Sequence, residues 1–116
     1  MSALSMMKNL TLAAVCAVAM FQAAPSRAQQ ATEIALTYSK GQFQPSAVTA
    51  PADKPIVFRV RNLDAKAMEF ESTSLRVEKV VAAGSEGVIN VRALKPGRYE
   101  FYDDFNDKAR GALTVQ

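Results

Sequence analysis

The 116-residue chain has 14 Lys and Arg against 11 Asp and Glu, a net charge of +3 that is too small and scattered for a nucleic-acid-binding surface. It has no histidine and one cysteine, Cys16, which excludes an internal disulfide, a Cys/His zinc site and a Ser-His-Asp triad. Its length is typical of one domain, not two.

Residues 1–28 are typical of a secretory signal peptide. Lys8 provides the positive charge near the start, an apolar run follows over residues 10–21, and small residues precede a cleavage position after Ala28. The apolar run is shorter than the ~20 residues of a membrane span, and a retained N-terminal anchor is the alternative. We therefore expect residues 29–116 to form a periplasmic domain that is not inserted in a membrane.

Apolar and polar residues then alternate with a period of two, which predicts half-buried strands. The clearest case is Ile56, Phe58 and Val60, which face one way, with Arg59 and Arg61 on the other side. Strands are expected over residues 34–38, 47–50, 55–61, 68–71, 77–81, 87–94, 99–102 and 111–115, and one turn of helix over residues 72–77. Seven or eight short strands separated by turn residues predict an all-β Greek-key β-sandwich.

Two segments, residues 62–70 and 96–103, resemble the cupredoxin family. The first is similar to an Asn-led loop that in this family ends at a copper-binding histidine, and Met68 stands at the histidine position. The second is similar to the closing strand of the family, and Asp103 stands at the position of the copper-binding cysteine. The resemblance supports the β-sandwich and places the family's metal site at the ends of these segments.

The other two copper positions of the family fall near Asn106 and near Ala109 or Arg110. A blue-copper centre needs imidazole and thiolate ligands, which this set of residues does not supply. We therefore expect no electron transfer through a type 1 copper centre.

Two further motifs, Glu69-Phe70-Glu71 and Glu78-Lys79, resemble the EfeO-type cupredoxin-like domains. Those domains are periplasmic components that accompany bacterial high-affinity iron permeases, and some of them carry histidine where this chain has Asn106. The resemblance implies a role in iron uptake, with iron as the metal and copper or manganese as alternatives. It also implies two partners, an iron permease and a second periplasmic iron-binding protein.

Five residues are candidate metal ligands: Met68, Glu69, Glu71, Asp103 and Asp104. Carboxylates suit hard or borderline ions and favour Fe(III) over Fe(II), on which a ferroxidase activity would rest. A regular strand places Glu69 and Glu71 on the face opposite Met68, so only one of these sets faces the site unless a bulge intervenes. The sequence assigns no catalytic residue.

Alternation also turns Asp103 inward, on the side of Tyr99 and Phe101. A buried carboxylate needs a partner, which is either a metal ion or a cation such as Lys66, Lys79 or Arg110. The alternative to metal binding is a metal-free sandwich that acts as an adaptor and docks a periplasmic or membrane partner.

Overall fold

The computed structural model describes residues 30–116, which form nine strands and no helix. The strands are β1 (Thr32–Ser39), β2 (Gln42–Gln44), β3 (Ala47–Ala50), β4 (Ile56–Asn62), β5 (Met68–Ser72), β6 (Val77–Val81), β7 (Glu86–Val91), β8 (Gly97–Asp103) and β9 (Asn106–Val115). In this part of the chain no helix could cross a membrane. The predicted signal peptide, residues 1–28, lies outside the described residues.

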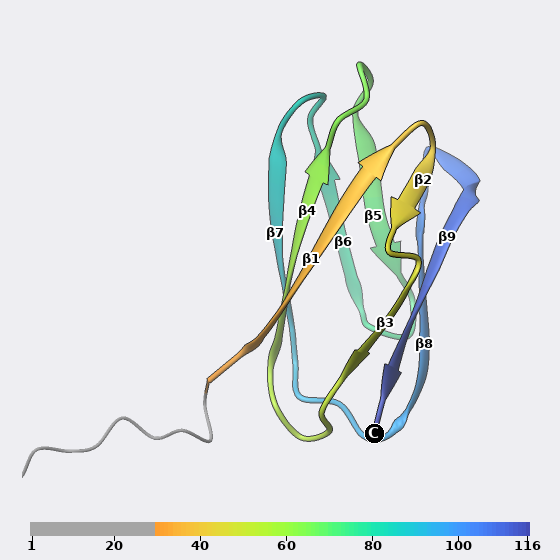
Figure 1. The fold of residues 1–116 in the computed structure, drawn as a ribbon. Helices are drawn as coiled ribbons and strands as arrows, with labels where there is room; N and C mark the ends of the chain where they lie inside the picture. The colour runs from red at the N-terminus through yellow and green to blue at the C-terminus, as the bar shows by residue number, and fades with distance from the viewer. Residues whose placement is uncertain (1–29) are drawn as a thin grey trace, which may run out of the picture.

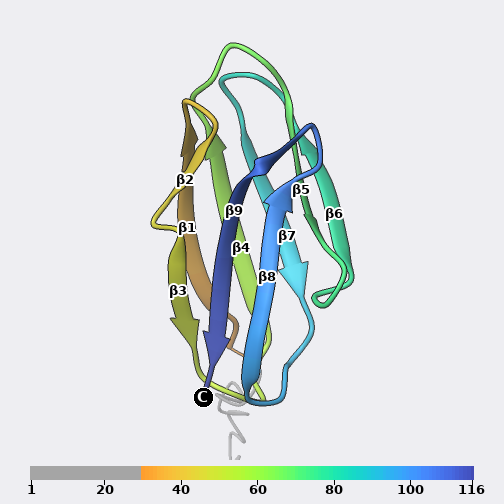
Figure 2. The same cartoon turned by 90° about the vertical axis from the view of Figure 1, so that its right-hand side faces the viewer.

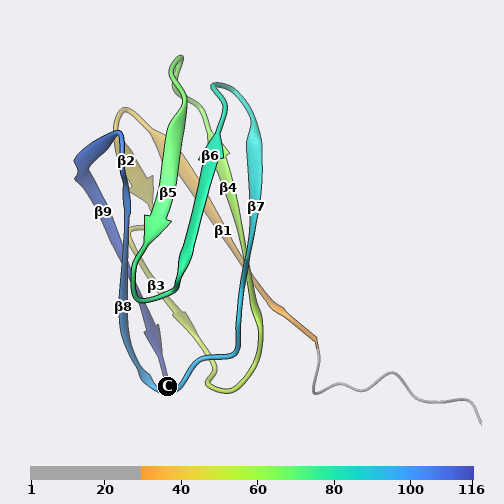
Figure 3. The same ribbon diagram turned by 180° about the vertical axis from the view of Figure 1, so that it is seen from behind.

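The strands form two sheets that pack face to face, which confirms the predicted all-β sandwich (Figures 1 and 3). One sheet has the order β2-β1-β4-β7 and the other the order β3-β9-β8-β5-β6. Figure 2 looks onto the five-stranded sheet, with β3 on the left and β6 on the right. β1 pairs with β4 and β3 with β9 in parallel, and the other neighbours are antiparallel.

Several local predictions differ from the structure: the short strand β2 was not predicted, and the strand expected over residues 87–94 ends at Val91. Residues 73–76 form a turn and not a helical turn, with Arg76 at φ 59°. β9 begins at Asn106, five residues before the predicted strand. The prediction missed this start because the first residues of β9 are mostly polar and exposed and therefore show no alternation. The pairing of β9 with β8 also shifts register at Tyr102 and Asp103.

Aromatic side chains from both sheets meet at the centre of the sandwich. Phe58, Phe70 and Phe101 have no exposed surface, and their ring centroids lie 5.2–5.7 Å apart. Phe43 packs edge-on against Phe101 at 5.1 Å. Buried residues alternate along β4, β5 and β7, so one face of each of these strands faces the core and the other is left free for polar groups.

Four connections meet at one end of the sandwich, at the top of Figure 1. They are the turn after β1, the loop between β4 and β5, the turn between β6 and β7, and the turn between β8 and β9. We call this end the upper pole, and it is where the first segment that resembles cupredoxins approaches Asp103, the last residue of the second.

Gly111 tests how tightly the Phe101 ring packs against the neighbouring strand β9 within the five-stranded sheet. A Cβ added there would overlap the Phe101 ring and lie 2.9 Å from the Ser46 carbonyl oxygen. Gly111→Ala should therefore lower the free energy of unfolding by about 1–3 kcal/mol in urea denaturation. Gly97→Ala is the control, because its Cβ would make only ordinary contacts of 3.6 Å or more with Tyr99. Equal stability of the two variants would contradict this account of the packing.

Candidate functional site

Asp103 is the most buried charged residue of the upper pole, with 2% of its surface exposed. The Tyr38 hydroxyl donates to its Oδ2 at 2.5 Å. The backbone N–H groups of Glu69 and Phe105 donate to Oδ1 at 2.8 and 3.0 Å. Alternation correctly predicted that Asp103 points inward, and its partners are these three donors.

The partners considered from the sequence, Lys66, Lys79 and Arg110, are therefore not those that the structure gives Asp103. The Tyr38 hydroxyl can take the place of a cation here because Tyr38 stays neutral and keeps the proton that it donates to Asp103. Burial, followed by the hydrogen bond and the charge of Asp103, raises the pKa of Tyr38 far above its usual value. Tyr38 lies 65 residues before Asp103 in the chain, and only its place on the inward face of a predicted strand hints at the contact.

Asn62 holds the loop between β4 and β5 in place. It is fully buried, its Nδ2 donates to the carbonyls of Lys66 and Val81, and its Oδ1 accepts from the N–H of Asp64. The Asp64 carboxylate in turn accepts from the N–H groups of Lys40 and Gly41, at 2.6 and 3.1 Å. These bonds fix the turn after β1 against the loop before β5, so the upper pole is built by hydrogen bonds.

A hollow of about 410 Å³ opens at this pole. Its lining consists of Tyr38, Lys40, Gly41, Asp64, Lys66, Ala67, Asp103, Phe105 and Asn106. These residues offer oxygen atoms, amines and an amide, with no imidazole or thiolate among them. The lining of this hollow therefore offers neither of the donor types that a blue-copper centre uses.

Met68 begins β5 at this end but faces the interior. Its side chain has no exposed surface and belongs to the hydrophobic core. Glu69 and Glu71 alternate with it and lie half-buried on the outer face of the five-stranded sheet. The strand is regular, so the predicted division of β5 between Met68 and the glutamates is confirmed.

Three carboxylates converge on this outer face. One oxygen from each of Glu69, Glu71 and Asp104 lies within 4.8 Å of the others, and we call this group the acidic triad. Asp104 reaches β5 because its N–H donates to the Glu69 carbonyl at 2.9 Å. Asp103 and Asp104 thus point to opposite sides of the sheet, one into the core and one into the triad.

The acidic triad is electrostatically costly. Burial and the neighbouring charges of Glu78 and Asp104 raise the pKa of Glu69, and burial and Asp104 raise the pKa of Glu71. The Oε2 atom of Glu71 is buried and has no hydrogen-bond partner among the described residues. Glu78 lies directly across from Glu71 on β6 and adds a like charge. A bound cation would relieve all of these costs.

The structure therefore separates the five predicted ligands into two groups. Glu69, Glu71 and Asp104 converge, whereas Met68 and Asp103 face the interior. Metal binding by these residues stays a prediction.

Removing the Tyr38 hydroxyl should leave Asp103 Oδ2 buried without its donor. Tyr38→Phe is expected to lower the free energy of unfolding by about 1–3 kcal/mol, because a buried acceptor then lacks its bond. Tyr99→Phe is the control, since the Tyr99 hydroxyl donates to the exposed Lys95 carbonyl. Urea denaturation at pH 7 compares the two, and an equal loss in both would contradict the assigned role of Tyr38.

Glu71→Gln should stabilise the metal-free chain at pH 7. The pKa of Glu71 in the folded chain lies above its ordinary value of 4.5, so the folded state holds more protons between these two values. Stability therefore falls as the pH rises through this window, and the neutral glutamine removes that loss.

Urea midpoints of the wild-type chain and of Glu71→Gln, followed from pH 3 to 7, measure this effect. The gain should be largest at pH 7 and should vanish below the ordinary pKa of glutamic acid, 4.5. Glu33→Gln removes an exposed glutamate that pairs with Arg59 on the other sheet, and should show no such gain. A Glu71→Gln variant that is less stable than wild type at pH 7 would contradict the repulsion.

Comparisons with known proteins agree with this architecture. A model of the cupredoxin-like domain matches residues 11–115. The uncharacterized protein RP394 of Rickettsia prowazekii (strain Madrid E) is 36% identical over 84 residues, which cover 72% of this chain and 67% of that protein.

Solved structures share the fold at lower identity. The metal-binding domain of the Streptococcus pneumoniae Cu(I)-exporting ATPase CopA, solved with Cu(I), has a TM-score of 0.66 at 19% identity and covers 72% of this chain and 84% of its own. An apo copper-binding protein has a TM-score of 0.66 at 18% identity, and the match covers 76% of this chain and 93% of that one. Auracyanin B has a TM-score of 0.63 at 14% identity, and the match covers 76% of this chain and 91% of that one. From its match over residues 11–115, the chain belongs to the cupredoxin-like domain family.

Proposed function

We propose that this chain is a periplasmic metal-binding protein of iron uptake, and that it holds iron at the acidic triad. The observation that carries the proposal is the Glu71 Oε2 atom, which is buried beside two further carboxylates and has no hydrogen-bond partner within residues 30–116. A buried acceptor without a donor is rare in folded proteins and calls for an explanation such as an ion. A cation at this position would bind that oxygen and neutralise its neighbours.

The donor set favours a hard ion. Three carboxylate oxygens and no sulfur suit Fe(III) or Mn(II) better than Cu(I). Three negative charges also stabilise a trivalent ion more than a divalent one, so binding would favour Fe(III) over Fe(II). This preference is the basis on which a ferroxidase activity would rest. Iron is chosen over manganese because Glu69-Phe70-Glu71 and Glu78-Lys79 resemble the EfeO-type domains.

The position of the triad suits delivery to a partner. It lies on the outer face of the five-stranded sheet, and Asp104 is exposed. An ion could therefore enter and leave without any opening of the core. An iron permease that approaches this face would receive the ion, and a second periplasmic iron-binding protein would exchange it there. The periplasmic location rests on the signal-like residues 1–28.

Metal titration of the 116-residue chain tests the proposal. The wild-type protein should bind Mn(II) and chelated Fe(III) with one site per chain. Glu71→Gln should weaken both by at least about tenfold, because it removes a charged ligand. Glu33→Gln, the same change on the other sheet, should bind as the wild type does. Wild-type protein that binds neither ion at micromolar concentration would refute the proposal.

The metal-free adaptor has one observation in its favour. Leu63 and Phe105 are 53% and 58% exposed, and both lie in the connections of the upper pole. Large exposed apolar side chains of this kind are common where proteins dock. If the wild-type chain binds no metal but iron uptake is lost in Phe105→Ser, the adaptor would be the better description.

A further inference from the structure

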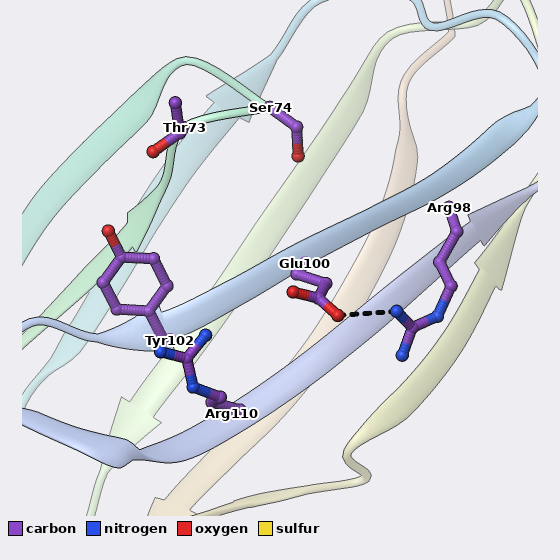
Figure 4. Close-up of a pocket in the computed structure, with 6 residues that line it drawn as sticks. All are labelled: Thr73, Ser74, Arg98, Glu100, Tyr102 and Arg110. Atoms are coloured by element: carbon purple, nitrogen blue, oxygen red, sulfur yellow. Dashed lines mark hydrogen bonds and ion pairs between the residues drawn. The ribbon is translucent and has the colours of Figure 1, made fainter.

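A second hollow lies on the same outer face as the acidic triad. It has a volume of about 450 Å³ and is lined by Thr73, Ser74, Arg98, Glu100, Tyr102 and Arg110 (Figure 4). The two arginines stand at its opposite ends, with Glu100 between them. We call it the arginine groove. Nothing in the fold requires two arginines here, since all six lining residues lie on the outer surface.

Arg110 is held in place for binding. Its guanidinium lies over the Tyr102 ring, 5.1 Å from the ring centroid, and its Nε donates to the Asp107 carbonyl at 2.9 Å. These contacts orient the planar group and leave its two terminal nitrogens without a hydrogen bond to the described residues. A pre-oriented guanidinium loses little entropy when it pairs with a carboxylate or phosphate through two parallel bonds.

Arg98 is held by a 2.6 Å pair with Glu100, and its side chain is 64% exposed. The pair uses one terminal nitrogen of Arg98, and its other N–H groups remain available to a ligand. The lining therefore carries two positive charges and one negative charge, with the hydroxyls of Thr73 and Ser74 opposite. This combination suits an anion rich in oxygen atoms.

The arginine groove and the acidic triad are neighbours. Glu71 on β5 lies across from Tyr102 on β8, which lies across from Arg110 on β9. Two strand spacings place the backbones of Glu71 and Arg110 about 10 Å apart. Thr73 also lines both the groove and a smaller hollow that contains Glu71. One extended ligand can therefore touch both sites.

The triad leaves room for such a ligand. Three carboxylate oxygens fill about half of a six-coordinate shell of a hard ion, and the other positions must come from water or from a ligand. Three carboxylates also balance the charge of Fe(III). Any chelator that arrives with the ion therefore adds net negative charge, which the triad repels and the arginines attract.

We propose that this face binds iron as a chelate with a small polycarboxylate, with the ion at the acidic triad and a free carboxylate of the chelator in the arginine groove. The inference rests on the proposed function. An extended polycarboxylate fits better than inorganic phosphate, because the two sites are separated by the width of Tyr102 on β8. Tyr102 and Arg110 then select the chelate, and Glu71 selects the ion.

Equilibrium dialysis of the 116-residue chain tests the proposal with Fe(III)–citrate, Mn(II), citrate alone and inorganic phosphate alone. Arg110→Gln should weaken binding of Fe(III)–citrate by about tenfold, because one charged bidentate contact is lost. It should not weaken binding of Mn(II), because the lost positive charge only repelled that ion. Arg61→Gln makes the same change on the outer face of the four-stranded sheet and should alter neither.

Three results would overturn this inference and leave metal binding standing. One is wild-type protein that binds Mn(II) but not Fe(III)–citrate, and another is equal Fe(III)–citrate affinity in Arg110→Gln and Arg61→Gln. The third is binding of citrate or phosphate alone as tightly as the chelate, which would show a plain anion site. Wild-type protein that binds neither metal form refutes the proposed function itself.

Discussion

The buried carboxylate of Asp103 organises the upper pole. It joins three parts of the chain through hydrogen bonds from the Tyr38 hydroxyl on β1, the Glu69 N–H on β5 and the Phe105 N–H in the last turn. A carboxylate in a core is tolerated only when its oxygens are paired, so these bonds must form together. Asp103 therefore joins the two sheets to one turn.

The same contact also builds the outer face. Because Asp103 points inward, Asp104 follows on the outside, and its N–H bonds to the Glu69 carbonyl. This places the Asp104 carboxylate beside Glu69 and Glu71. The hydrogen bonds of Asp103 and the acidic triad thus lie on opposite sides of the same turn. A substitution at Asp103 would therefore change the geometry of the triad, even though the Asp103 and Asp104 carboxylates face opposite sides of the sheet.

The acidic triad brings electrostatic repulsion to the outer face, and the packing of the core does not require it. Glu69, Glu71 and Glu78 crowd one outer face, and one buried oxygen finds no donor in the part of the chain that the structure describes. A face selected for stability alone would carry lysine or threonine at one of these positions. Folds commonly keep such unfavourable groups where they bind something, and the adjacent arginine groove gives the face both signs of charge.

The sequence by itself determined the class of fold and the side of each strand. Alternation along residues 56–60 and 68–71, and the turns between them, were enough to predict a sandwich and to turn Met68 and Asp103 inward, because burial follows a period of two. Only the tertiary structure decided which residues meet. The Tyr38–Asp103 bond, the approach of Asp104 to Glu71 and the arginine groove all join separate strands. Register and sheet order set such contacts, and no local pattern encodes them.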